Sequence, residues 1–215
     1  MSLPVLPTRL FPCGKSGILP YTKVDYLEST GTQYISFYTM TGTETSVRFV
    51  INFACSLVRD RLRYISRPDS SNGPRVFGLI NGQGSGYNLR MSCDSGGSVG
   101  AGSFSANGAW HTLDATFDSN GDITRIYDGT LATYSRTFIV VAGGAFQMFG
   151  IAKEPFVGKI SKFQLYTDGV LVRDLIPVVL DIGKVACMYD KVSKTFFYNA
   201  GTGKFYSNLD PVPQV

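Results

Sequence analysis

The sequence has little glutamate, almost no histidine and no dense run of one charge, and each shortage excludes a class of protein. Its 215 residues include three glutamates (Glu28, Glu44, Glu154) and one histidine, His111. Scarce glutamate beside 24 glycines, 12 tyrosines and 15 phenylalanines disfavours a helical protein. Lysine and arginine exceed aspartate and glutamate only by 20 to 16, a net charge of +4, without a dense block. We therefore expect no nucleic-acid partner.

Long apolar runs and paired cysteines are also missing. The apolar stretch 137–152 has no charged residue, but it is short and contains three glycines, so we expect no membrane insertion. No two cysteines form a CxxC pair, and a chain of this length needs no disulfide stapling. We expect unpaired, mostly buried thiols at all four positions, Cys13, Cys55, Cys93 and Cys187.

The first twenty residues are punctuated by proline and lack the basic start of a secretory signal peptide. Because proline fixes φ and cannot donate a backbone hydrogen bond, we expect residues 1–20 to form an extended arm outside any sheet. Its apolar side chains need cover, and they include Leu6, Leu10 and Phe11. The arm either packs along its own domain or docks onto another subunit or a virion protein.

From residue 21 onward, short apolar segments alternate with turn signals. In 45–53, Val47, Phe49, Ile51 and Phe53 would share one face of a strand. We expect further strands at 32–40, 76–80, 87–92, 112–118, 123–127, 132–141, 145–151, 157–167, 170–177, 186–190 and 195–198. Asn-Gly or Asp-Gly pairs, which suit tight hairpins, begin at residues 72, 81, 107, 120, 128 and 168.

These signals predict an all-β fold, a two-sheet antiparallel β-sandwich at 21–206, followed by a C-terminal tail at 207–215. Near its end, 160–166 and 170–175 should form a hairpin that places Phe163 and Leu165 opposite Leu171 and Arg173 or their neighbours. Pro177 should end that pairing. A second hairpin should join 188–190 to 196–198, and the C-terminal segment should return beside the opening strand.

Three segments carry a family resemblance. They are 24–35 (VDYLESTGTQYI), then 110–113 (WHTL) with 126–129 (IYDG), and finally KFQLYTDGVLVRDLIPV followed by MYDKVSKTFFYNAGTGKF within 162–206. Together they resemble the concanavalin A-like, or laminin-G-like, jelly-roll modules of bacteriophage virion proteins and gut-bacterial surface proteins. The resemblance implies two curved antiparallel sheets with a concave face for glycan or protein contact. The arm and residues 55–105 do not share it.

Catalytic and metal chemistry find little support in the residue pattern. Retaining glycosidases need two carboxyl groups about 5 Å apart, and the glutamates here are isolated in sequence. Asp118, Asn120 and Asp122 lack the spacing of an EF-hand and indicate a solvated turn. We expect His111 to be a structural strand residue, no enzymatic activity and no cofactor. A calcium site built from distant loops, with Asp94 as a ligand, stays open.

A shallow sugar site is the binding chemistry that the residues favour most. The glycine-rich stretch 81–88 ends with Tyr87 and Asn88 and is followed by Arg90 and Asp94. These four residues offer amide, charged and stacking groups, although an ordinary hairpin has the same composition. Trp110 either stacks on a sugar or packs against the sandwich rim. The arginine group at residues 59, 61, 63, 67 and 75 is either a solvated strand face or a site for an anionic partner.

Taken together, the sequence predicts a non-enzymatic structural or adhesion module of a phage virion, on a capsid, fibre or tail. Its partners would be other virion proteins, through the arm, and a host-surface glycan or protein. It would be made in the host cytoplasm and released on lysis, as a monomer or a homo-oligomer. The alternative is a secreted or surface-bound bacterial carbohydrate-binding module, or a domain related to glycoside hydrolases.

Overall fold

A computed structural model describes residues 20–55, 61–67, 75–83, 86–92, 98–104, 107–118, 122–135, 145–151 and 154–210. For 61–104, and for residues 151, 154 and 155, it describes only the backbone of those ranges. Across these ranges the secondary structure is strand and turn without helix, which confirms the all-β prediction. Within them there is accordingly no helix long and apolar enough to cross a membrane.

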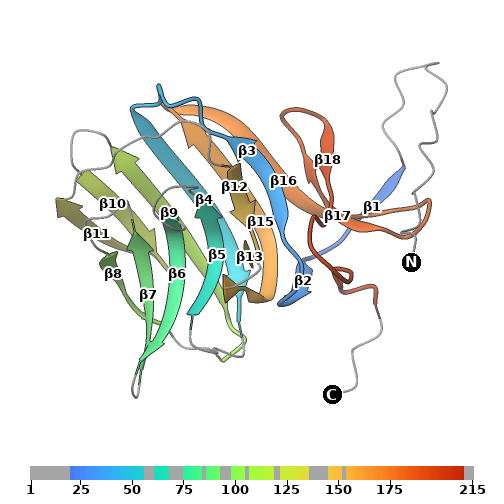
Figure 1. Ribbon diagram of the computed structural model, residues 1–215, viewed down its shortest axis with the longest axis horizontal. Coiled ribbons are helices and arrows are strands. Elements are labelled where there is room, and N and C mark those ends of the chain that lie inside the picture. The colour runs from blue at the N-terminus through green and yellow to red at the C-terminus, as the bar shows by residue number, and fades with distance from the viewer. Residues whose placement is uncertain are drawn as a thin grey trace, which may run out of the picture.

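Two antiparallel sheets form the molecule (Figure 1). The larger has the order β11-β10-β9-β4-β15-β16-β17-β18, with β1 paired to β16 and β2 paired to β15. Its strands are β1 (Tyr21–Lys23), β2 (Leu27–Thr30), β4 (Ser46–Ala54), β9 (Trp110–Asp118), β10 (Asp122–Tyr127), β11 (Thr130–Ser135), β15 (Val157–Thr167), β16 (Val170–Leu180), β17 (Ala186–Asp190) and β18 (Thr195–Phe197).

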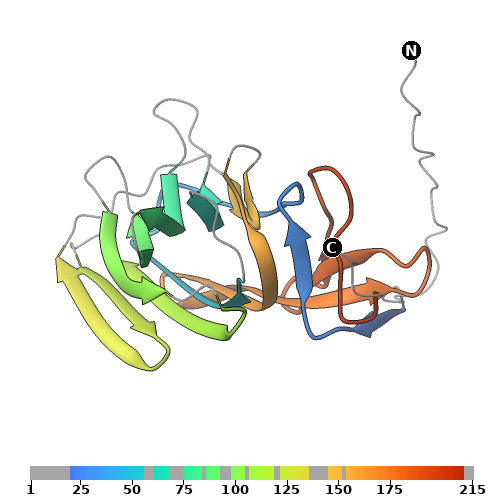
Figure 2. The ribbon, with the colours of Figure 1, turned by 90° about the horizontal axis from the view of Figure 1, so that it is seen from below.

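The smaller sheet has the order β3-β12-β5-β6-β7-β8. Its strands are β3 (Ile35–Thr39), β5 (Arg61–Arg67), β6 (Arg75–Gln83), β7 (Gly86–Ser92), β8 (Ser98–Phe104) and β12 (Ala145–Met148), and a separate pair joins β13 (Gly150–Ile151) to β14 (Glu154–Pro155). Figures 1 and 2 show that the smaller sheet covers the part of the larger one around β9 and β4, whereas β1, β17 and β18 extend beyond it. This extension supports the site described below.

The core between the layers follows the period-two pattern of the strands. In β4, Phe49 and Phe53 are fully buried with their alternating neighbours, as the sequence predicted. Phe37 of β3 meets Phe163 of β15 across the layers, with ring centroids 4.9 Å apart. Burying such a side chain contributes about 1.5–3 kcal/mol. The prediction of one strand over 145–151 was wrong, because Phe149, with φ 67°, separates β12 from β13.

The two Asp-Gly hairpins that the structure describes are confirmed. Asp168 and Gly169, with φ of 49° and 78°, join β15 to β16, and Asp128 and Gly129 join β10 to β11 in the same way. The register places Leu165 opposite Arg173, as expected. The Asn-Gly pair at 81–82 is not a turn: it lies inside β6 and pairs with β7. The pairs at 72–73 and 120–121 lie outside the described residues.

The pairing of the hairpin ends before Pro177, as predicted, but the proline does not end β16. The ladder between β15 and β16 runs only to Leu175, but β16 continues to Leu180, paired with β17 on one side and with β1 on the other. Proline removes a donor but keeps its carbonyl, which here accepts a hydrogen bond from Val24 N at 3.2 Å. The proline therefore marks the point where β16 changes partner.

The first and last segments that carry the family resemblance lie against each other, and we call this junction, residues 29–34 with 199–203, the clasp. Ala200 N donates to Tyr34 O at 2.8 Å, and Thr202 N donates to Thr32 O at 3.0 Å. Next to it, Glu28 and Tyr206 exchange two backbone hydrogen bonds. The predicted return of the C-terminal segment beside the opening strand is thus confirmed. The residues of both motifs have a structural role, because they hold the two segments together.

The cysteines that the structure describes are buried thiols, Cys55 and Cys187. Burial raises the pKa of Cys187 to about 12, so this thiol is protonated and unreactive at neutral pH. Cys13 and Cys93 lie outside the described residues.

Candidate functional site

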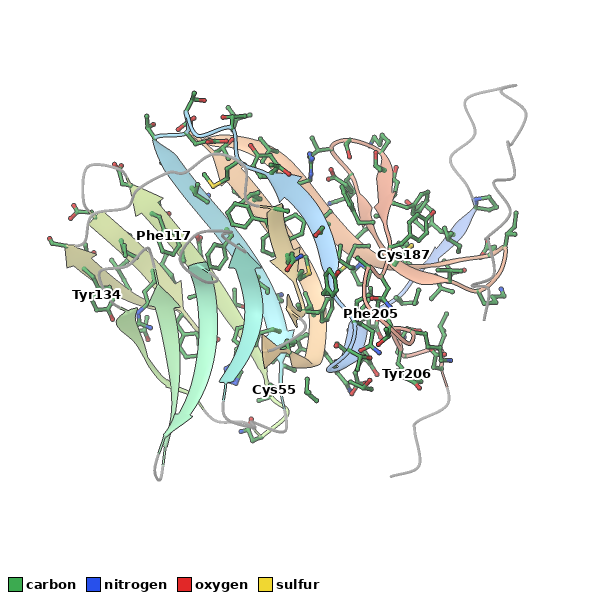
Figure 3. All side chains as sticks on the ribbon, in the orientation of Figure 1. Cys55, Phe117, Tyr134, Cys187, Phe205 and Tyr206 are labelled. Carbon is green, nitrogen blue, oxygen red and sulfur yellow. The ribbon has the colours of Figure 1, made fainter. Side chains whose placement is uncertain are left out.

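An open pocket of about 680 Å³ lies where the C-terminal segment crosses the extension of the larger sheet. One wall is the turn between β16 and β17, and the other is the chain from Tyr198 to Asp210. Figure 3 shows Cys187, Phe205 and Tyr206 in this part of the molecule, at the opposite end from Phe117 and Tyr134. The pocket is lined by residues 183–186, 198, 199, 201, 203–205, 207, 209 and 210 of these walls, together with Thr22, Val179 and Asp181.

The clasp holds one wall of the pocket in place. The side-chain oxygen of Asn199 accepts hydrogen bonds from Tyr34 N at 3.2 Å and from Gly201 N at 2.8 Å. Its amide nitrogen donates to the carbonyls of Thr202 and Gly203 at 3.4 and 3.0 Å. Asn199 is therefore a structural part of the wall, and the loop that follows it is fixed before any ligand arrives. Such preorganisation lowers the entropic cost of binding.

Two of the charged groups of the pocket, Lys204 and Asp210, pair with each other. Lys204 Nζ lies 3.2 Å from Asp210 Oδ1, while Asp210 Oδ2 accepts hydrogen bonds from Ser207 N and Oγ at 2.9 and 3.0 Å. Burial would raise the pKa of Asp210, but the hydrogen bonds from Ser207 and Lys204 outweigh it and lower the pKa below 3.8. With Lys184 and Asp181, the lining holds two cationic and two anionic side chains and no net charge.

Tyr198 supplies the exposed aromatic group of the pocket, whereas Phe205, which also lines it, is buried. Tyr198 is 46% exposed, and Leu209 and Val185 of the facing walls are also exposed. Burial of the rest of the ring, and secondly the neighbouring Cys187, raise the pKa of its hydroxyl, which stays protonated at neutral pH. It can therefore donate as well as accept a hydrogen bond. An exposed aromatic face beside hydroxyls and paired charges is the chemistry that a bound sugar uses.

Trp110, the one sequence-predicted ligand residue whose side chain the structure describes, does not line this pocket. Trp110 is the first residue of β9 and is 47% exposed, with its ring 6.2 Å from that of Tyr26. Tyr87, Asn88 and Arg90 lie in β7, between β6 and β8, and the structure does not describe their side chains. The structure does not describe Asp94, Leu6, Leu10 or Phe11. For the arginine group it describes the backbone at most, and none of the side chains.

Sequence reasoning missed Tyr198, Lys184, Lys204 and Asp210. A signal was present, because Tyr198 precedes the glycine-rich segment 199–203 and two lysines flank the pocket in sequence. In the structure that segment is held by the hydrogen bonds of the clasp. The pocket joins the turn at 181–186 to the chain at 198–210, and only the tertiary structure brings them together.

His111 is held by its neighbours at one end of β9. Its Nδ1 lies 2.7 Å from Asp128 Oδ2 and 2.9 Å from the hydroxyl of Tyr127, and its ring stacks on that tyrosine at 5.5 Å. Asp118 and Asp122 lie at strand ends, opposite Ser46 and Ser135. Among the residues that the structure describes, no three His, Cys, Asp or Glu side chains gather closely enough to hold a metal ion.

No family model matches the chain, and no curated protein matches it in sequence. Solved structures do match. A putative carbohydrate-binding protein from Bacteroides ovatus superposes with a TM-score of 0.59 at 14% identity, over 86% of this chain and 60% of that one. The fold is a concanavalin A-like, laminin-G-like jelly roll. This confirms the fold that the sequence resemblance implied.

Two further structures share this jelly roll. The full extracellular region of zebrafish Gpr126 gives a TM-score of 0.52 at 14% identity, over 85% of this chain and 26% of that one. The CBM40 module of a Ruminococcus gnavus sialidase gives a TM-score of 0.50 at 15% identity, over 70% of this chain and 92% of that one. At such identities the jelly roll is shared, while its function has to be argued from this chain's own site.

Proposed function

We propose that this chain is a glycan-binding module without catalytic activity, and that the pocket beside Tyr198 is its sugar site. The observation that carries the proposal is the pocket itself: a fixed wall, one exposed aromatic ring, a protonated phenol, and charges that cancel. A sugar presents an apolar face and many hydroxyls but usually little charge, so this lining complements it. The carbohydrate-binding proteins that share the fold support the same proposal.

Two acidic side chains, Glu44 and Asp114, are already held in hydrogen bonds, and this supports a binding role over hydrolysis. Both oxygens of Glu44 accept backbone hydrogen bonds, from Thr41 N and Gly42 N at 2.8 and 2.9 Å. Asp114 pairs with Arg48 through two hydrogen bonds. A retaining hydrolase needs two carboxyl groups about 5 Å apart across a substrate, with one of them able to act as an acid. We therefore propose that incubation with β-glucans releases no reducing ends.

The location of the module is part of the proposal. The sequence favoured a phage virion and kept an extracellular or cell-surface protein as the alternative. The solved structures that share the fold include an extracellular receptor region and bacterial carbohydrate-binding proteins, and they favour this alternative. We propose an extracellular or surface-exposed module. A virion module that contacts host glycans would use the same pocket.

A glycan array with the full chain tests the function, followed by titration calorimetry with the best ligand. We expect Tyr198→Ala to weaken binding at least about tenfold, which corresponds to about 1.4 kcal/mol, because it removes both the stacking face and the phenol. Leu131→Ala is the matched control, since Leu131 is 64% exposed on β11, far from the pocket, and should leave affinity unchanged. A folded chain that binds no glycan, or a Tyr198→Ala variant of wild-type affinity, would contradict the proposal.

A further inference from the structure

One row of side chains crosses the larger sheet at the end nearest the clasp. The register places Trp110 of β9 opposite Ala54 of β4, Ala54 opposite Lys159 of β15, Lys159 opposite Glu28 of β2, and Glu28 opposite Tyr206. Residues paired in this way point to the same face of a sheet. Their chain neighbours Phe53, Ile160, Leu27 and Phe205 are buried in the core, so this row faces away from it, although the small side chain of Ala54 is itself covered at 3% exposure.

The row, which with Tyr26 and Lys204 we call the outer strip, has aromatic rings at both ends and a charged pair between them. Tyr26 lies beside Trp110, and Lys159 Nζ lies 4.4 Å above the ring of Tyr26 and 3.8 Å from Glu28 Oε2. At the other end, Lys204 Nζ lies 4.8 Å from the ring centroid of Tyr206. Figure 3 labels Cys55, which follows Ala54, and Tyr206 in the lower half of the view.

The outer strip leads to the pocket. Lys204, its last member, pairs with Asp210, and both residues line the pocket. From Trp110 to Tyr206 the row spans four intervals between neighbouring strands, or roughly 19 Å at about 4.8 Å for each. That length accommodates several sugar units laid end to end. It is far more than the pocket needs for one unit.

The charged side chains of the strip indicate whether a neutral or an anionic polysaccharide would bind to it. Each lysine has a carboxylate partner, Glu28 for Lys159 and Asp210 for Lys204. Counted together with Asp210, the strip therefore carries no net charge, and an anionic polymer would have to displace these carboxylates before it could pair with the lysines. Aromatic faces spaced along a surface suit the apolar faces of successive sugar rings.

We propose that the outer strip binds the internal units of an extended, neutral polysaccharide whose chain continues into the pocket beside Tyr198. This inference rests on the proposed function and extends it from a single sugar to a polymer. Trp110, which is nearly half exposed, provides the stacking face at the far end. The charged pairs supply hydrogen bonds to hydroxyl groups between the rings.

The single tryptophan makes the test specific, because its fluorescence reports contact at Trp110 alone. The full chain is run in affinity gels containing mixed-linkage β-glucan, xylan or mannan, with polygalacturonate as the anionic polymer, and is titrated with the same polymers. We expect retardation by at least one neutral polymer, a shift of Trp110 emission, and little change when salt is raised. Trp110→Ala and Tyr26→Ala should each weaken binding to this polymer at least about fivefold.

Two controls separate the strip from the pocket and from folding. Tyr166→Ala changes a tyrosine elsewhere on β15, where it contacts Arg48, and should leave retardation unchanged. Trp110→Phe keeps an aromatic face and should retain most of the affinity, while thermal melting checks that each variant folds. One result would overturn the proposed role of the strip while the proposed function stands. In that result Tyr198→Ala weakens polymer binding, Trp110→Ala binds the polymer as the wild type does, and the polymer does not shift the wild-type Trp110 emission. If polygalacturonate retards the protein more than the neutral polymers do, and salt weakens this retardation, the proposal of a neutral ligand is wrong. If the protein binds no sugar at all, both proposals are wrong.

Discussion

Asp190 shows how one buried carboxylate organises the end of the chain. It is fully buried, and its Oδ1 accepts hydrogen bonds from Asp174 N and Val192 N at 2.9 and 3.0 Å. Its Oδ2 accepts from Ser193 N and Oγ at 3.2 and 2.7 Å. Burial would raise the pKa of this carboxyl, but the hydrogen bonds, that of the Ser193 side chain first, outweigh it and lower the pKa below 3.8. The charged form of Asp190 therefore stabilises the fold.

We predict that Asp190→Asn destabilises the protein by about 3 kcal/mol near neutral pH, because an amide nitrogen in place of one oxygen cannot accept its hydrogen bonds. Since the folded-state pKa is lowered, the contribution of Asp190 is present above the unfolded-state value of 3.8 and is lost as pH falls through the folded-state value. Urea unfolding from about pH 6 to about pH 3 should show the gap between wild type and variant shrinking on acidification. A gap that stays constant or widens at low pH would refute the linkage.

At the scale of elements, the clasp explains why the opening and closing segments have the sequences they have. Gly201 has no side chain because a Cβ there would lie 2.1 Å from the carbonyl oxygen of Thr32. The hairpin at Asp128 and Gly129 has a different requirement, because Gly129 adopts φ +82° with open space around its Cα. One glycine is required by close backbone approach and the other by backbone conformation.

We predict that Gly201→Ala costs about 3 kcal/mol of unfolding free energy, because backbone atoms must move apart to admit the methyl group. Gly129→Ala is the matched control and should cost only about 1 kcal/mol, the strain of a positive φ for alanine. Hydrogen exchange should also show faster exchange at Ala200 N and Thr202 N in the Gly201 variant, with β4 amides unchanged. If the two variants lose the same unfolding free energy, the clasp is packed less tightly than its hydrogen bonds indicate.

For the whole molecule, the extension of the larger sheet beyond the smaller one has packing of its own. A second apolar cluster, Val178, Leu180, Cys187 and Tyr189, is buried there, and Tyr21 and Phe196 pack against it. The ring of Tyr189 lies 4.9 Å from each of these two aromatic rings. This packing allows β16 and β17 to support a pocket outside the main sandwich.

We predict that the thiol of Cys187 reports unfolding of this extension. Its pKa of about 12 and its complete burial should prevent alkylation by iodoacetamide in the native protein at about pH 8. Peptide mass spectrometry should find Cys187 labelled only in urea, with the same midpoint as the loss of the circular-dichroism signal. Labelling well below that midpoint would show that the extension unfolds before the sandwich.

How far the sequence predicts such a molecule can be judged from particular residues. The alternation of Val47, Phe49, Ile51 and Phe53 indicated a strand with one buried face, and Asp168-Gly169 indicated the hairpin between β15 and β16, because both signals are local. The Asn-Gly pair at 81–82 was misread, and the continuation of β16 past Pro177 was not predicted, since strand partners on either side decide whether a proline or a turn dipeptide interrupts a ladder.

The order of side chains along the chain by itself determined the fold class, the two Asp-Gly hairpins and the burial pattern, because each depends on neighbours a few residues apart. The tertiary structure decided the candidate site. Tyr198 and Lys184 come together through the return of β17 and the clasp, and Trp110 and Tyr206 share one face only through the register of four pairings. Such contacts depend on which strands pair, and pairing is set by the burial of the whole core rather than by any local segment.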